Sequence, residues 1–224
     1  MSLSLGIGLG LCFRSIAVSV VSMVLADSVV SSADQTTYTF AGRTLGSGLI
    51  IIAGSFRAGS LITLNSLSVA GNSANIHVTS SNGNTSAAFI ASAVNAAASG
   101  DIVLTFSGTC ARLGLAVYLF KGYTETAPYL TATATRTSTA GTMSPNLVGA
   151  ISKGFVIGAG FNGLAPGHRV GAASAAVDAQ TNYNVTVNCQ SGANSWTGIT
   201  EDVDAEMEAT GTAVVQAACS AAFR

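Results

Sequence analysis

Apolar and polar residues alternate in short runs along most of the chain, and clusters of glycine, serine and asparagine separate the runs. Alternation with a period of two is typical of β-strands that bury one face. We find no segment in which a 3.6-residue period coincides with helix-capping residues. The pattern therefore predicts an all-β protein. The expected strands cover residues 36–42, 48–56, 61–69, 75–79, 87–94, 130–139, 154–161, 182–189, 195–207 and 212–223, in addition to the stretch described next.

Residues 101–122, DIVLTFSGTCARLGLAVYLFKG, contain two of the strongest apolar runs in the chain. The first run alternates, and the second, LGLAVYLF, is nearly continuous and rich in β-branched and aromatic residues, as buried strands are. The polar segment SGTCAR lies between them. The pattern predicts a hairpin in the sheet core whose turn exposes Cys110 and Arg112 at one end of the fold.

These expected strands share one style of sequence, and no linker divides them. Many short strands with turn signals between them favour two packed antiparallel sheets. We expect residues 34–224 to form one antiparallel, two-sheet β-sandwich of jelly-roll type.

Residues 1–33 differ from the rest of the chain. Their apolar side chains alternate with serine and glycine, which is typical of an extended strand with one adhesive face. We expect an apolar N-terminal arm that attaches the domain to a partner. The proposed contact residues are Leu3, Leu5, Ile7, Leu9 and Leu11.

A cleaved signal peptide that ends before Asp27 is the alternative for this segment. Two features count against it: no positive charge precedes the apolar run, and Arg14 interrupts that run. The mass of the intact mature protein distinguishes the two interpretations.

Composition and charge narrow the range of partners. Hydrophobic residues make up 49% of the chain and charged residues only 8%, against about a quarter in typical soluble domains. The formal net charge is −1. No basic stripe is present that would neutralise phosphates, which argues against a nucleic-acid partner. Little charge repulsion protects such a surface from association, so we expect an assembled protein, most simply a homo-oligomer.

Residues that could carry catalysis are few and scattered. His168, with Asp178 or Asp101 as an orienting acid, is the best candidate base, but no serine lies in a GxSxG elbow. His168 and His77 are each more readily interpreted as hydrogen-bonding surface residues than as catalytic bases. Two histidines cannot make a multi-histidine metal site. The acidic segment 201–208 reads as a solvated strand face more readily than as a calcium loop. We expect no enzyme activity, no cofactor and no metal.

The cysteines and aromatic residues leave two alternatives open. Cys189 and Cys219 end expected strands, so a disulfide between them is possible, but buried reduced thiols suit an intracellular assembly equally well. Trp196 and Tyr123 are candidate stacking surfaces for a glycan, although a single tryptophan in a sandwich more often belongs to the core.

Three stretches carry a resemblance to a known group. They are MSLSLGIGLGL at the start, LITLNSLSVAG with AAFIASAV and SGDIVLTFSGTCARLGLAVYLFKG in the middle, and WTGITEDVDAEMEATGTAVVQAACSAAF at the end. In these stretches the chain resembles virion proteins of tailed bacteriophages and of prophages in alphaproteobacteria and marine bacteria. The resemblance implies a structural role in the particle, and its diffuse strand patterns transfer no binding residues.

Together these observations predict a non-enzymatic virion component, either a capsid-surface decoration or a fibre- or tail-associated jelly-roll protein. Its partners would be other virion proteins, with no membrane span and with a host-surface glycan as a further candidate. The alternative is a secreted or surface-displayed carbohydrate-binding β-sandwich.

Overall fold

The computed structural model describes residues 21–83, 85–136, 141–143, 145, 147–151, 154–162, 176–184, 189–196, 203–205, 209–211 and 216–224. Its regular elements are all β-strands. Every strand pair is antiparallel. The predicted all-β, antiparallel class is therefore confirmed.

The first eight strands form one large sheet. They are β1 (Ser22–Ser31), β2 (Gln35–Thr44), β3 (Gly48–Ala58), β4 (Leu64–Val69), β5 (Asn72–Ser73), β6 (Asn75–Ser81), β7 (Ser86–Asn95) and β8 (Ser99–Lys121). The main path of this sheet is β5-β4-β8-β3-β7-β6, and β1 and β2 also pair with β8.

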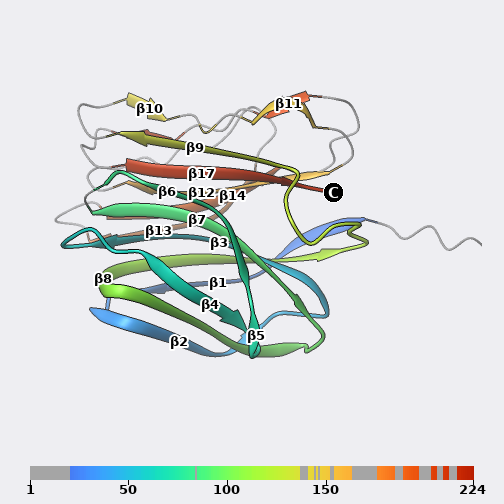
Figure 1. Ribbon diagram of the computed structural model, residues 1–224, viewed down its shortest axis with the longest axis horizontal. Helices are drawn as coiled ribbons and strands as arrows, with labels where there is room; N and C mark the ends of the chain where they lie inside the picture. Colours follow the sequence, from blue (N-terminus) through green and yellow to red (C-terminus); the bar gives the residue numbers. More distant parts are fainter. Residues whose placement is uncertain are drawn as a thin grey trace, which may run out of the picture.

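The remaining strands form a five-stranded sheet, β13-β14-β12-β17-β9, and two small pairs, β10-β16 and β11-β15. In Figure 1 the strands run across the page, with β10 and β11 at the top, β9 and β17 below them, and β2 near the bottom. The strands are β9 (Leu130–Arg136), β10 (Gly141–Met143), β11 (Leu147–Ile151), β12 (Phe155–Asn162), β13 (Ala176–Asn184), β14 (Cys189–Trp196), β15 (Val203–Ala205), β16 (Ala209–Gly211) and β17 (Gln216–Phe223).

The predicted hairpin at residues 101–122 is wrong, because β8 runs through it as one strand of 23 residues. The amino-terminal half of β8 pairs with β2 and β4, and its carboxyl-terminal half pairs with β1 and β3. The change of partners falls between Phe106 and Cys110, where a Cβ on Gly108 would lie 2.9 Å from Ile62. The polar segment in the sequence marks this change of partners. Cys110 is consequently buried, and the Arg112 side chain is only 28% exposed.

The change of partners in β8 produces layers. One core cluster lies between β2, β4 and the first half of β8 on one side and β3, β7 and the second half of β8 on the other. A second cluster fills the opposite face of β3, β7 and β8, against β12 and β17. The described residues thus make three layers, and the middle sheet is covered on both faces.

Burial on both faces explains the continuous apolar runs. Eight consecutive residues of β3, from Leu49 to Phe56, are buried, and β7 shows the same pattern. Strands that are covered on both faces lose the alternation of half-exposed strands. The first half of β8, which is covered on one face, keeps that alternation from Ile102 to Phe106.

The segment expected to be an arm is partly a sheet strand. Residues 22–31 form β1, which pairs with β8 along its whole length. Residues 1–20 lie outside the described residues, and so do the predicted contacts at Leu3, Leu5, Ile7, Leu9 and Leu11.

Candidate functional site

The outer edge of β1 is the first candidate site. Within the described chain β1 pairs only with β8, so its other edge is unpaired. Among the residues whose side chains are described, six large apolar ones are exposed, and four of these lie in or beside this strand: Val21, Val24, Leu25 and Val30. We call these four residues the β1 edge. The residues lie on both faces of the strand, since Val24 is opposite Leu119 of one core and Leu25 is opposite Tyr118 of the other.

Edge strands normally carry charges or proline, which discourage pairing with another chain. The only charged residue of β1 is Asp27, and it is already bound. Its carboxylate lies 2.5 Å from Arg43 and accepts hydrogen bonds from the amides of Ser28 and Thr44. The strand therefore offers its neighbours an apolar edge without a free charge.

Asp27 also fixes the position of β1. It lies at a register shift between Leu25 and Asp27, which bends the strand. Partial burial acts to raise its pKa, but the hydrogen bonds from Arg43 and the two amides outweigh that effect and lower the pKa. The carboxylate is thus ionised at neutral pH and joins β1 to the end of β2.

The second candidate site is a groove where the large sheet fails to close between β5 and β7. The pairing of β6 with β7 begins at Asn75 and Ser92, so within the described residues no strand pairs with β7 beyond Ser92 on that side. The resulting hollow has a volume of about 330 Å³. We call it the β5–β7 groove. Its lining residues are Leu49, Asn72, Ser73, Asn75, Ser92, Ala93, Val94 and Thr126.

A histidine and a serine meet at the wall of this groove. His77 Nε2 lies 2.7 Å from the Ser92 hydroxyl, and that hydroxyl donates its hydrogen to the backbone oxygen of Thr126 at 2.7 Å. Because the serine hydrogen is used there, Nε2 must carry a hydrogen and donate it to Ser92. A nucleophilic serine requires the opposite direction of proton transfer. The pair therefore holds the wall together and is not arranged for catalysis.

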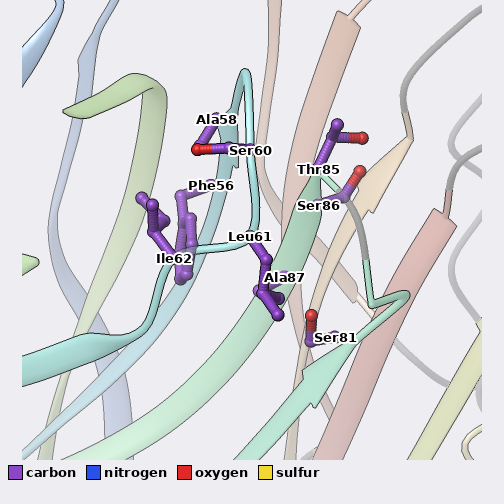
Figure 2. A pocket seen from close by; sticks show the side chains of 9 residues that line it. All are labelled: Phe56, Ala58, Ser60, Leu61, Ile62, Ser81, Thr85, Ser86 and Ala87. Atoms are coloured by element: carbon purple, nitrogen blue, oxygen red, sulfur yellow. The ribbon is translucent and has the colours of Figure 1, made fainter. Parts of the chain in front are cut away.

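A third hollow lies beside the loop that follows β3, and Figure 2 shows its lining. Phe56, Ile62 and Ala87 form its apolar part, and Leu61, which is largely exposed, lies next to them. The slot has no room for a water molecule. In Figure 2 the hydroxyls of Thr85 and Ser86 point away from the apolar side chains, so they offer this slot no polar anchor.

The candidate glycan residues are not brought together with the groove. Tyr123 is half-buried and packs on Phe120, with ring centroids 6.1 Å apart. Trp196 ends β14 opposite Val156, and its side chain lies outside the described part of the chain. Tyr123 is not among the residues that line the groove.

The candidate catalytic residues are likewise separated or outside the description. Asp101 accepts a hydrogen bond from the amide of Gly42. Asp178 lies at an irregularity in β13, and only its backbone is described. His168 and most of the acidic segment 201–208 fall outside the described residues. Among the residues that are described, no cluster of histidine, cysteine and acidic side chains could hold a metal ion.

The sheet geometry excludes a disulfide between Cys189 and Cys219. Their strands, β14 and β17, lie on opposite sides of β12, and Cys219 is opposite Ala159 while β14 reaches that position only at Ala193. Two strand spacings of about 4.8 Å already exceed the Cα separation of a disulfide. Cys219 and Cys110 are buried free thiols.

Sequence reasoning missed both candidate sites. The apolar residues of the β1 edge are visible in the sequence, but they fall within residues 1–33, which the alternation from Leu3 to Leu11 predicts to be an extended arm. The groove has no sequence signal of its own, because it depends on the residue at which β6 begins to pair with β7.

Comparisons with protein-family models, with curated proteins and with solved structures each find no match. Within the described ranges, no helix is long and apolar enough to cross a membrane.

Proposed function

We propose that the chain is a non-enzymatic structural subunit of a bacteriophage particle, attached to the capsid surface or to a tail structure through its N-terminal segment. The observation that carries this proposal is the β1 edge, which presents four exposed apolar residues in or beside a strand whose outer edge is unpaired within the described chain, directly after residues 1–20. An edge of this kind suits addition of a strand from a neighbouring subunit.

The resemblance to tailed-phage virion proteins supplies the setting of the proposal. On this proposal the jelly-roll sandwich that the strand pattern predicts would be formed by the first two layers, in which β2, β4 and the start of β8 face β3 and β7. On this proposal the β12–β17 layer is an addition to that sandwich. The low content of charged residues fits a surface that neighbouring subunits cover.

The test uses particles released from a host that encodes this chain. We expect the intact chain to be present in purified particles. Deletion of residues 2–20, which leaves β1 in place, should reduce incorporation at least tenfold, and so should Val24→Lys, because a lysine on an apolar edge opposes pairing. Thr39→Lys is the matched control, since Thr39 is an exposed strand residue of β2. The proposal would be refuted if the chain were absent from the particles. It would also be refuted if the deletion of residues 2–20 and Val24→Lys were both fully incorporated.

A further inference from the structure

The β5–β7 groove has the size and composition of a small binding site. Its volume of about 330 Å³ lies at the lower end of the range for small-molecule sites, about 300–1,000 Å³. Residues from four separate segments line it: the start of β3, the β5–β6 region, the carboxyl end of β7 and the loop at Thr126. No part of this groove is used in the attachment proposed above.

The residues that line the groove indicate whether a bound ligand would be charged or neutral. None of its eight residues is ionisable. The nearest acid along the chain, Glu125, is paired with Arg224 at 3.3 Å. A charged ligand would lose water in the groove without gaining a counter-charge, which is unfavourable. The lining therefore favours an uncharged ligand.

The polar groups of the groove suit hydroxyl groups. Asn72, Ser73 and Asn75 are exposed and contribute two amides and one hydroxyl, each of which can both donate and accept hydrogen bonds. Val94, 52% exposed, supplies an apolar surface beside them. A sugar ring carries both hydroxyl groups, which can bond to these amides and this hydroxyl, and C–H groups, which can pack against Val94.

The wall of the groove is held in place before a ligand binds. The hydrogen bonds from His77 to Ser92 and from Ser92 to Thr126 connect β6, β7 and the loop. Burial lowers the pKa of His77, which favours the neutral ring. A rigid wall reduces the entropy lost on binding.

We propose that the β5–β7 groove binds a neutral saccharide unit, with Asn72 and Asn75 bonding its hydroxyls and Val94 packing against its C–H face. This inference is independent of the proposed virion role, and it places glycan recognition away from Trp196 and Tyr123. The binding strength expected of so small a site is in the millimolar range, about 4 kcal/mol.

The experiment is a titration of the full chain followed by two-dimensional NMR. The probes are D-glucose, D-galactose, N-acetyl-D-glucosamine and the disaccharides cellobiose, lactose and chitobiose, with D-glucuronate as the charged comparison. We expect saturable shifts at Ser73, Asn75 and Val94 with at least one neutral sugar, and weaker binding of D-glucuronate.

Two variants with matched controls test the location. Ser73→Trp fills the groove and should abolish binding, whereas Ser66→Trp, on an exposed serine of β4, should not. Asn75→Ala should weaken binding about fivefold through the lost hydrogen bonds, while Asn65→Ala should leave it unchanged.

Three outcomes would overturn the inference. They are no saturable binding by any neutral sugar in the panel, binding that Ser73→Trp does not affect, and D-glucuronate binding more tightly than every neutral sugar. A pentapeptide of alternating threonine and valine is included as a further probe. Shifts at Val94 with this peptide and with none of the sugars would assign the groove to an added β-strand instead.

Discussion

Gly54 makes room for the buried ring of Phe89 in the core between β2, β4, β3 and β7. It lies opposite Phe89 in the β3–β7 pair, and a Cβ at this position would overlap the Phe89 ring. Phe89 also packs near Phe56, with ring centroids 6.3 Å apart. The absence of a side chain at Gly54 is therefore what admits the buried ring.

We expect Gly54→Ala to lower the free energy of unfolding by about 1–3 kcal/mol, because the added methyl group displaces a ring that close neighbours confine. Chemical denaturation measures this change. Gly59→Ala is the control, since a Cβ there meets nothing within 4 Å. In the Phe89→Leu background the cost of Gly54→Ala should shrink. An equal cost in both backgrounds would mean that the ring is not the cause.

The buried thiol of Cys110 makes the free energy of unfolding depend on pH in the alkaline range. Burial raises the pKa of its thiol from 9.0 to about 11. A thiol that ionises more easily in the unfolded chain stabilises the fold below pH 9, and this contribution is lost as the pH rises toward 11. Tyr38 and Cys219 also have raised pKa values and act in the same direction.

The contribution of Cys110 is therefore measured by comparing the free energy of unfolding of the wild-type chain with that of Cys110→Ala. Between pH 9 and pH 11 the wild-type chain should lose about 2 kcal/mol more stability than Cys110→Ala, as expected for a shift of two pKa units. Denaturant titrations at a series of pH values provide the comparison. Parallel pH profiles for the two proteins would contradict the prediction.

At the scale of elements, β1 is held by three kinds of contact: its backbone pairing with β8, the packing of Met23 and Val29, and the ion pair of Asp27 with Arg43. The first two leave its outer edge apolar and exposed. The third fixes the strand against the end of β2, where the carboxylate accepts an amide hydrogen from Thr44.

Asp27→Asn should weaken this attachment and speed amide exchange of β1 at neutral pH. Because the pKa of Asp27 is lowered in the fold, its stabilising effect is present above about pH 4 and is lost as the pH falls through that lowered value. Wild type and variant should therefore converge in acid. Hydrogen exchange read by NMR at several pH values measures the difference. Asp34→Asn, at an exposed carboxylate 3.8 Å from Arg112, is the control and should change little.

The strands that could be predicted from the sequence are those with a clear local pattern. Strands such as β2, β3, β7, β9 and β12 were located correctly, because apolar runs bounded by small polar residues are a local property. In β8 the segment around Gly108 looked like a hairpin turn, since small polar residues mark turns and strand bends alike. The expected strand at residues 182–189 was also misplaced, because β13 ends at Asn184 and β14 begins at Cys189.

At the scale of the whole molecule, the middle sheet couples the layers. Neighbouring residues of β3 point into different cores: Ile51 belongs to the core shared with β12 and β17, and Ile52 to the core shared with β4 and β8. Neither the third layer nor the candidate groove could be predicted, because both depend on contacts between strands far apart in the sequence.

We expect Ile51→Ala and Ile52→Ala each to lower stability by about 2–5 kcal/mol. Because one sheet serves both cores, each variant should still unfold in a single transition. Near-ultraviolet and far-ultraviolet circular dichroism followed during denaturation should coincide. Thr39→Ala, on an exposed strand position, is the control. A separate early transition in either variant would show that the layers unfold independently.

The pairing of β8 with β1, β2, β3 and β4 also sets an order in time. All four partners are synthesised before β8, and β1 precedes its partner residues by about ninety positions. During translation these strands leave the ribosome with apolar residues and no complete sheet to join. Long-range pairing of this kind is slow and exposes intermediates to aggregation. Completion of β8 is therefore the step at which the strands of the large sheet can pair, and substitutions at Gly108, where the partners of β8 change, should reduce the yield of folded protein in cells more than they reduce its final stability.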